Sequence, residues 1–406
     1  MSSADAQSIL SERILKMKES ATLRMAQLAR DVAAQGHQVI SLSLGEPDFD
    51  TPQHIKEAAM QALRDGFTKY TPVPGLVELR QAISQKFKEE NNLDYGIDQI
   101  VVSNGAKQTI ANICMALLDK GDEVVILAPF WVSYSAIVKL AGGVPVYVSA
   151  GIEQDYKVSA QQLQAAITSK TKFVLFSSPC NPTGSVFTEG ELRAFAKIIA
   201  ARQNLYVVAD EIYEYINFTP RHFSIGSIEE IKHRVITVNG FSKGFAMTGW
   251  RLGYMGAPAF IAKACAKIQG QNTSGACAFG QKAAVTALTS DKAPSRAMRA
   301  AYLKRRDLMI SLLNDIPGLK TNHPQGAFYI FPDCSYYFGK SHKDHIIHNA
   351  DDLSAYLMNV AHVGVVSGTA FGADNCFRIS YAASEEDLRE AMRRVGEALE
   401  KLTIRN

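Results

Sequence analysis

One lysine stands among residues that are unusual neighbours for a surface lysine. Lys243 lies in "NGFSKGFAMTGWRLGY", residues 239–254, where it and Ser242 interrupt a largely apolar run, and Arg251 follows eight residues later. A lysine amine becomes a nucleophile at neutral pH when burial or a nearby cation lowers its pKa. A serine hydroxyl and an arginine guanidinium are suited to a phosphate monoester. Lys243 is therefore either a stray surface residue or a buried amine with chemistry to perform.

Three other polar stretches follow strand-like runs. "SNGAKQTIA", residues 103–111, is a glycine-containing turn into a helix, whose free N–H groups can hold a phosphate, although it matches neither GxxxxGK[ST] nor GxGxxG. Asn181 in "SSPCNPTG" either caps a turn or contacts a ligand. Asp210 in "VVADEIYEYINF" is either a helix N-cap or a buried carboxylate that needs a cation or donors, and Tyr213 shares its face if a helical turn begins there.

Taken together, these groups describe one ligand better than any of them does alone. They suit a phosphate, a cationic ring nitrogen that faces a carboxylate, a phenolic oxygen that needs hydrogen-bond donors, and an aldehyde that reacts with a lysine. These features are combined in pyridoxal 5'-phosphate. A nicotinamide cofactor is disfavoured because no glycine fingerprint follows a strand.

The elements around these residues predict an α/β fold. Short apolar runs ("DEVVILAP", "VPVYVSA", "TKFVLFSSP", "NLYVVADE", "RVITVNGFS") alternate with helix-like segments from about residue 51 to residue 290. This pattern indicates a largely parallel sheet covered by helices on both faces. Ligands of such sheets bind at the carboxyl ends of the strands, where the polar residues above are expected to meet.

The two ends of the chain differ from this central part. The first 35 or so residues show helical spacing, Gly36 supplies a stop signal, and a strand-like "QVISLSLG" follows. The tail, with "GAFYIFPD" and "FRISYAAS" between helix-like stretches, predicts a smaller α+β domain. We therefore expect an N-terminal arm and part of the small domain in residues 1–50, a large cofactor-binding domain in 51–290 and a small domain in 291–406.

Composition excludes several classes of protein. A length of 406 residues favours two domains, and a net charge of +3 gives no reason to expect nucleic acid or a membrane surface as partner. The six cysteines are scattered without metal-ligand spacing, so a metal is not expected, and "SHKDHIIHNA" is interpreted as an exposed loop or helix start. With no signal peptide and no long apolar run, the expected location is the cytoplasm.

The sequence also resembles a known family. "GEPDFDTP", "KYTPVPG", "SSPCNPTG", "VADEIYE", "FSKGFAMTGWRLGY" and "FRISYA" occur in the order seen in class I aminotransferases of fold type I, over residues 10–400. Within that family the chain is most similar to bacterial aspartate aminotransferases, in the subgroup that includes prephenate-using members. The resemblance implies a large domain with a seven-stranded, mostly parallel sheet, a smaller α+β domain, and ping-pong transfer of an amino group to 2-oxoglutarate.

The resemblance also implies a role for each residue around the cofactor ring. Lys243 would hold the cofactor covalently and later move a proton. Asp210 would pair with the pyridine nitrogen, because a carboxylate keeps that nitrogen protonated and the ring electron-withdrawing. Asn181 and Tyr213 would donate to the phenolic oxygen, and Trp131 would stack on the ring, although a tryptophan in "PFWVSY" is equally suited to packing.

The same resemblance implies a phosphate site that is completed by a second subunit. The expected phosphate ligands are the N–H groups of the turn after Gly105, at Ala106 and Lys107, together with Ser242 and Arg251. Tyr70 in "KYTPVPG" would reach the phosphate of the neighbouring subunit, which implies a homodimer with shared sites.

The substrate would lie against a further set of residues. Gly45 and Arg378 would receive the α-carboxylate, the arginine through a bidentate pair, with Trp131 and Asn181 beside it. An alternative for Arg378 is an ordinary ion pair at a strand edge. Lys107 and the polar residues 20–22 of the arm (Ser20 to Thr22) match features that favour an acidic side chain in this subgroup.

The chain departs from the family pattern at a few positions, among them Gly244-Phe245, where Ala-Tyr is commoner, and Cys180. No catalytic group is lost, but the substrate preference is left open. An aromatic or kynurenine-type aminotransferase and a C–S β-lyase are alternatives on the same fold. A cofactor-sensing regulatory domain is a non-enzyme alternative, disfavoured because only a short arm precedes "GEPDFDTP".

Overall fold

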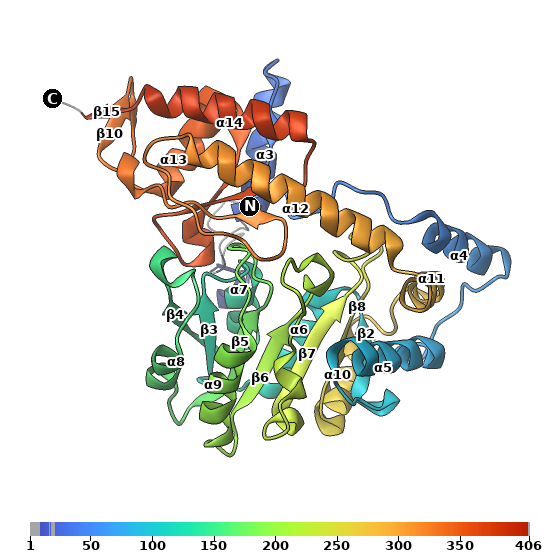
Figure 1. Cartoon of the computed structure of the whole chain (residues 1–406). Helices are drawn as coiled ribbons and strands as arrows, with labels where there is room; N and C mark the ends of the chain where they lie inside the picture. The colour runs from blue at the N-terminus through green and yellow to red at the C-terminus, as the bar shows by residue number, and fades with distance from the viewer. Residues whose placement is uncertain (1–8, 16, 18–20, 405–406) are drawn as a thin grey trace.

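A seven-stranded sheet forms the centre of the computed structural model, which describes residues 9–15, 17 and 21–404. Figure 1 shows the sheet and its helices in the lower half of the molecule. The strands, in spatial order, are β2 (Ile100–Ser103), β8 (Gly253–Gly256), β7 (Val235–Gly240), β6 (Tyr206–Asp210), β5 (Thr171–Ser177), β3 (Glu123–Ala128) and β4 (Val144–Ser149). Strand β8 runs antiparallel to the other six strands, so its pairings with β2 and β7 are antiparallel and the remaining pairings are parallel. The predicted α/β class with a mostly parallel seven-stranded sheet is confirmed.

Helices cover both faces of this sheet. They are α4 (Gln53–Arg64), α5 (Val77–Asn91), α6 (Ala106–Leu117), α7 (Ser133–Leu140), α8 (Ala160–Ala166), α9 (Glu189–Ala200), α10 (Ala259–Asn272) and α11 (Ala278–Thr289). Successive strand residues point to opposite faces: Val208 of β6 packs in one core with α6, α7 and α10, and Val207 packs in another with α8 and α9. Burial on both faces explains why these strands read as continuous apolar runs.

The seventh strand, β8, carries almost no strand signal in the sequence. It is the four-residue "GYMG", and glycine weakens a strand because it has no side chain to pack. Both glycines are needed for close approach. A Cβ on Gly253 would overlap the backbone N of Ala106, and one on Gly256 would overlap the ring of Tyr95. The strand thus brings the end of the Lys243 segment against the start of α6.

A second region lies above the sheet in Figure 1, at the carboxyl ends of its parallel strands. Its helices are α3 (Ala21–Ala34), α12 (Ala293–Asn314), α13 (Ala350–Tyr356) and α14 (Glu385–Glu400). Its small sheets are β13 (Val366–Ser367), β14 (Phe377–Ser380) and β9 (Tyr329–Ile330); β11 (His345–Ile346), β10 (Lys340–His342) and β15 (Thr403–Ile404); and β1 (Ile40–Ser41) with β12 (Val363–Gly364). The first four residues of "FRISYA" thus form β14, a central, fully buried strand.

Short turns complete the chain. The 3₁₀ turns are η1 (Ile97–Gln99), η2 (Ile152–Gln154), η3 (Glu214–Ile216), η4 (Ile225–Ser227), η5 (Lys232–Arg234), η6 (Ser335–Tyr337) and η8 (Gly368–Phe371), and η7 (Leu357–Ala361) is a π turn. Because η3 begins just after Tyr213, Asp210 and Tyr213 lie on the turn that leaves β6. The histidine-containing stretch after Ser341 forms the β10–β11 hairpin and the approach to α13, where it is partly exposed.

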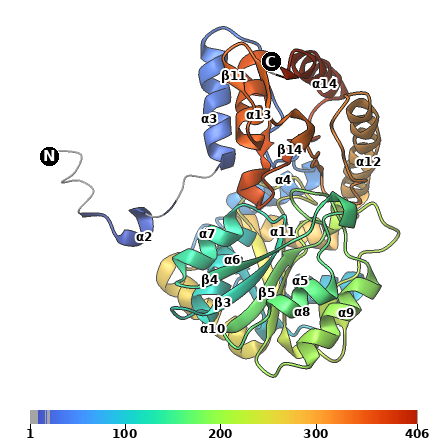
Figure 2. The ribbon, with the colours of Figure 1, turned by 90° about the vertical axis from the view of Figure 1, so that its left-hand side faces the viewer.

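The N-terminal arm differs in detail from the expectation. Helix α3 packs beside α13, whereas α2 (Glu12–Leu15) has no buried residue and projects away from the other elements (Figure 2). The strand expected over "QVISLSLG" is only two residues long, at β1. Its continuation passes the functional cavity instead, where the carbonyl groups of Ser43 and Gly45 accept hydrogen bonds from Arg378 and Lys243. Within the described residues, no helix is long and apolar enough to cross a membrane.

Candidate active site

A cavity of about 440 Å³ lies at the carboxyl ends of the central strands, between the sheet and the second region. This volume is typical of a small-molecule site. Most of the residues proposed from the sequence line it: Gly45, Ala106, Lys107, Trp131, Asn181, Asp210, Tyr213, Ser242, Lys243, Arg251 and Arg378. Gly105 lies directly behind the wall, and Tyr70 is 98% exposed and does not line the cavity of its own chain.

Lys243 extends into this cavity from the turn that follows β7. Its Nζ donates a hydrogen bond to the carbonyl of Gly45 and lies 5.9 Å from the centre of the Tyr213 ring. Burial, with Arg378 as the strongest cationic neighbour, lowers the pKa of the Lys243 amine to about 8. The structure therefore rejects the stray surface lysine: a larger fraction of this amine is neutral near pH 7 than for an ordinary lysine.

Asp210 ends β6 on the floor of the cavity and is 4% exposed. Its Oδ2 accepts a hydrogen bond of 2.7 Å from Tyr134, and its Oδ1 accepts one of 3.2 Å from the N–H of Ile212. In the described part of the chain no basic side chain forms an ion pair with it. Burial raises the pKa of Asp210 to about 6. The N-cap alternative fails, since no helix is capped by this side chain, and the carboxylate faces a cavity with room for a cation.

Arg378 stands on the opposite wall and is 2% exposed. Its Nη1 donates to Asn181 Oδ1 at 3.0 Å and its Nη2 donates to the carbonyl of Ser43 at 2.6 Å, while its Nε has no partner. No carboxylate of the described residues pairs with this guanidinium, so the strand-edge ion pair is excluded. Burial lowers the pKa of Arg378. A buried cation without an anion is costly, which makes it a binding group for an anionic ligand.

Two further polar groups lie between these charges. Because Asn181 Oδ1 accepts from Arg378, its Nδ2 is left to donate to a ligand, and within the described residues it makes no other hydrogen bond. The hydroxyl of Tyr213 shares a 2.8 Å hydrogen bond with that of Tyr329. Burial raises the pKa of Tyr213 well above its ordinary value, so this phenol stays protonated and can donate.

The far end of the cavity is shaped for an anion. Gly105 precedes α6 with φ of 86°, and a Cβ there would overlap the guanidinium of Arg251, so a glycine is required at this position. The first N–H groups of α6, at Ala106 and Lys107, have no partner in the helix and point at this end. Ser242 and Arg251 line the same end, and Arg251 is held by a 2.8 Å hydrogen bond to the carbonyl of Thr248.

Trp131 and Lys107 form the remaining wall. The Lys107 ammonium lies 5.1 Å from the centre of the Trp131 ring, which in turn packs edge-on against Tyr134 at 5.4 Å. Burial, with Arg251 nearby, lowers the pKa of Lys107. Of the arm residues expected beside Lys107, Ser20 and the Thr22 side chain lie outside the described residues.

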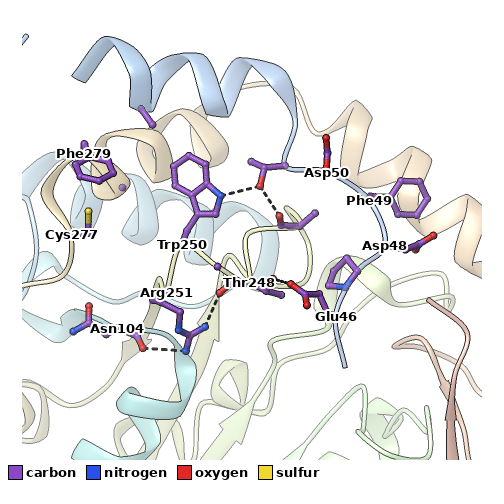
Figure 3. A pocket seen from close by; sticks show the side chains of 16 residues that line it. Glu46, Asp48, Phe49, Asp50, Asn104, Thr248, Trp250, Arg251, Cys277 and Phe279 are labelled. Carbon is purple, nitrogen blue, oxygen red and sulfur yellow. Dashed lines mark hydrogen bonds between the residues drawn. The ribbon is translucent and has the colours of Figure 1, made fainter. Parts of the chain in front are cut away.

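A second and larger hollow, of about 880 Å³, adjoins this cavity (Figure 3). The two share Glu46, Thr248 and Arg251. In its wall, Trp250 donates a hydrogen bond of 3.0 Å to Thr51. Despite its size it contains neither Lys243 nor Asp210, so we place the chemistry in the smaller cavity. The larger hollow instead leaves the Arg251 end open to the outside.

The structure also explains the unusual Gly244-Phe245. A Cβ on Gly244 would lie 2.5 Å from the ring of Tyr215, and the Gly244 carbonyl accepts a 2.6 Å hydrogen bond from Ser295 of α12. Phe245 is buried and meets the Tyr215 ring at 5.1 Å, centre to centre. The pair therefore packs the Lys243 turn onto Tyr215 and α12.

Sequence reasoning missed several lining residues, notably Tyr134, Tyr329, Glu46 and Thr248. Tyr134 had one usable signal, because it follows Trp131 by three residues and so shares a helical face. The other residues carry no local signal. Tyr329 lies in the short β9 and reaches the site only through the packing of the second region.

Comparisons with known proteins agree with this geometry. Residues 37–395 match the family described as aminotransferase class I and II. The chain is 45% identical over 403 residues to a probable aspartate/prephenate aminotransferase of Rickettsia felis, covering 98% of both chains. Its structure is similar to that of the aspartate aminotransferase from Rhizobium meliloti, with a TM-score of 0.94, 41% identity, and coverage of 97% of this chain and 99% of that one. It is also similar to an aromatic aminotransferase from Pyrococcus horikoshii, with a TM-score of 0.84, 41% identity, and coverage of 92% and 98%.

A match over most of the chain, full-length relatives and a cavity into which Lys243 extends all lead to the same conclusion. The chain belongs to the class I and II aminotransferase family.

Proposed function

We propose that the chain holds pyridoxal 5'-phosphate on Lys243 and transfers an amino group from L-aspartate to 2-oxoglutarate. The observation that carries this proposal is the pair of buried, unbalanced charges around Lys243. Asp210 is a carboxylate without a cation, and Arg378 is a guanidinium without an anion, among the described residues. A cofactor with a cationic ring nitrogen and a substrate with an α-carboxylate would balance both.

The other groups of the cavity suit the same cofactor. The N–H groups at the start of α6, with Ser242 and Arg251, match a phosphate. Asn181 Nδ2 and the Tyr213 hydroxyl are donors for a phenolic oxygen. Trp131 supplies an aromatic face for the ring. The donor set therefore fits the cofactor from its phosphate end to its aldehyde end.

When bound, the cofactor supplies an electron-withdrawing ring that stabilises negative charge on the substrate's Cα. Asp210 would hold the proton on the ring nitrogen, and Arg378 would orient the substrate through its α-carboxylate. The Lys243 amine has a pKa lowered to about 8. It is therefore suited to take the proton from the substrate's Cα in the first half of the reaction and to give a proton to Cα of the new amino acid in the second half. Lys243 therefore acts twice, as the covalent anchor and as the proton carrier.

Preference for an acidic substrate depends on Lys107. Its ammonium is the basic group at the Trp131 wall, where a β-carboxylate would lie once Arg378 holds the α-carboxylate. The relatives named as aspartate aminotransferases support this preference, but the identity of 41% is the same for the aromatic aminotransferase, so overall similarity does not decide it. The aromatic aminotransferase is therefore the second candidate, and the β-lyase is the third.

A panel of amino donors distinguishes these candidates. We expect kcat/KM for aspartate to exceed that for phenylalanine and kynurenine by at least about tenfold, because one charge-assisted hydrogen bond contributes about 1.5–3 kcal/mol. Lys107→Met should remove most of this difference by lowering the value for aspartate alone. Equal rates with aspartate and phenylalanine would favour the aromatic activity, and release of pyruvate from cystathionine would favour the lyase.

We further propose a homodimer in which Tyr70 of each chain completes the other chain's phosphate site. Tyr70 is 98% exposed, and the larger hollow opens the Arg251 end of the cavity to a second chain. Exposed apolar side chains on the arm, Ile9, Leu10, Ile14 and Leu15, are also suited to a subunit contact. We also propose that the domain boundaries lie at residues 50 and 290.

Mixing two impaired variants tests whether the two chains share their sites. Tyr70→Phe should lower cofactor affinity about 10- to 100-fold, through the loss of one hydrogen bond to a charged group. When it is mixed with Lys243→Ala at limiting cofactor, mixed dimers would contain one intact site, so roughly a quarter of all sites would regain activity. Activity that stays at the sum of the separate variants after subunit exchange would show that Tyr70 does not act across an interface.

A further inference from the structure

A second polar cluster lies directly behind the turn that carries Asp210 and Tyr213. These two residues line the cavity, whereas the residues that follow each of them, Glu211 and Glu214, do not. Glu211 is 3% exposed and Glu214 is 9% exposed. The turn therefore presents two functional groups to the cavity and two carboxylates to the protein interior.

Each interior carboxylate has its own cation. His222 Nε2 lies 3.0 Å from Glu211 Oε2, which also accepts a 2.6 Å hydrogen bond from Ser224. On the other side, Lys86 of α5 forms a buried ion pair with Glu214. The two pairs lie side by side behind β6.

Asn91 joins this cluster from the end of α5. It accepts from Lys86 at 2.7 Å and donates to Glu214 Oε2, also at 2.7 Å. Buried charges are tolerated when they are paired and hydrogen-bonded. Each charge of this cluster has a partner of opposite sign, and Asn91 and Ser224 donate hydrogen bonds to the two carboxylates. Ligand atoms of Glu211, Glu214 and His222 lie within 4.8 Å of one another, a spacing that a metal ion would also need. Lys86 and His222 already supply one positive charge for each of the two carboxylates.

The charge of His222 decides the balance of this cluster. Its Nδ1 lies 3.4 Å from Asn217 Nδ2, at the outer limit of a hydrogen bond, where the neutral ring would accept. The contact of Nε2 with the Glu211 carboxylate is shorter, at 3.0 Å, but lacks the geometry of a hydrogen bond. The charges of Glu211 and Glu214 raise the pKa of His222 in spite of its burial. We therefore take His222 as the imidazolium, which gives two positive and two negative charges.

Other titratable groups around the cluster do not change this sum. The Glu90 carboxylate lies 4.0 Å from Lys86 at the exposed edge, where Lys292 is a second cation on which its charge acts, so these two outer charges offset each other. The neighbouring phenols are protonated, because burial raises the pKa of each of them: Tyr95, Tyr215 and Tyr254. Of the described groups that face Glu211, His222 is thus the one that balances its charge.

Glu211 connects the charges of this cluster to the active site. It is adjacent to Asp210 in the chain, and its negative charge is one of the influences that raise the pKa of Asp210, after burial. The N–H of Glu211 also donates a 2.8 Å hydrogen bond to the carbonyl of Val238 in β7, which fixes the backbone at this point. A change of charge at Glu211 or His222 would therefore act on Asp210 without a contact to any ligand.

We propose that the Glu211–His222 and Glu214–Lys86 pairs are positioning groups, which fix the turn that presents Asp210 and Tyr213 and keep an unbalanced charge away from the Asp210 carboxylate. The consequence for catalysis rests on the proposed function, whereas the effect on Asp210 does not. The two variants His222→Gln and Glu211→Gln separate the effect of charge from that of packing. His222→Gln removes a positive charge and Glu211→Gln removes a negative one, and both change the side-chain volume little.

An infrared pH titration of the cofactor-free full chain tests the charge effect. The carboxyl C=O band of Asp210 is assigned by its absence in Asp210→Asn. His222→Gln should raise the apparent pKa of Asp210 and Glu211→Gln should lower it, each by at least about half a pH unit, and the double variant should return close to the wild type. Arg234→Gln is the matched control: Arg234 is a buried cation at the opposite end of β7, bonded to the carbonyl of Ile199, and its loss should leave the Asp210 band unshifted.

The cofactor-loaded enzyme provides the second readout. The same two variants should move the acidic limb of the kcat/KM profile in opposite directions, with KM for aspartate within about threefold of wild type. Shifts of the Asp210 band in a chain that fails to transaminate would leave the network standing and remove the proposed function. An unshifted band in both variants, or a shift in the same direction, would overturn the network even if the enzyme is fully active.

Discussion

Lys243→Ala is expected to lower the rate of transamination by at least about four orders of magnitude. The substitution removes the covalent anchor of the cofactor and the amine proposed to move a proton at the substrate's Cα, and proton transfer alone accounts for about 10²- to 10⁴-fold. The visible absorbance of the lysine-bound cofactor should disappear as well. Both are measured on the purified variant with saturating cofactor, aspartate and 2-oxoglutarate.

The matched control for this variant is Lys197→Ala. Lys197 is an exposed lysine of α9 that does not line the cavity, and its removal should change neither rate nor absorbance. Lys243→Ala should still bind the cofactor non-covalently, because Arg251, Ser242 and the start of α6 are unchanged. A Lys243→Ala enzyme with turnover within tenfold of wild type would contradict the assignment of this lysine.

Asp210→Asn is expected to cause the second largest loss, of about 10²- to 5 × 10³-fold in kcat/KM. Removal of one partner of a buried charge pair costs about 3–5 kcal/mol, and every 1.36 kcal/mol is a factor of ten in rate. The isosteric amide keeps the shape of the site but cannot hold a proton on the ring nitrogen. Tyr134→Phe, which removes only the 2.7 Å hydrogen bond to Asp210, should cause a much smaller loss and serves as the control.

The cofactor-free form of Asp210→Asn should show the opposite effect on stability. The folded pKa of Asp210, at about 6, lies above its ordinary value of 3.8, so the folded chain binds the proton more tightly than the unfolded chain. The wild type therefore loses stability relative to the variant as pH rises from about 4 to 6, and above that window the difference is about 3 kcal/mol. Denaturant unfolding at several pH values measures it. A cofactor-free variant less stable than wild type at pH 7 would show that the Asp210 carboxylate is not strained by burial.

The sequence was most informative about ionisable residues that directly follow a strand-like run. Asp210 and Lys243 each follow a continuous apolar run, so their position at the carboxyl edge of a parallel sheet could be predicted, and the cavity contains both. Arg378 was identified by the family motif, and its burial without an anion was visible only in the structure. The roles assigned to these residues remain predictions until the variants are measured.

Other features depend on long-range packing and left no local signal. Strand β8 reads as "GYMG" because its two glycines admit Ala106 and Tyr95, which are distant in sequence. Strand β1 is short, and in the segment that continues it the carbonyl groups of Ser43 and Gly45 accept hydrogen bonds from Arg378 and Lys243. A glycine stands at position 244 because the ring of Tyr215 lies against it. In each case the deciding partner lies far along the chain.

The most direct test of the central claim is a half-reaction. The purified, cofactor-loaded enzyme is mixed with aspartate in the absence of any 2-oxo acid, and the oxaloacetate released in a single turnover is counted against the number of sites. The proposed mechanism predicts one oxaloacetate for each site, with the amino group retained by the enzyme until 2-oxoglutarate removes it as glutamate. Release of no oxaloacetate until 2-oxoglutarate is added would contradict the account.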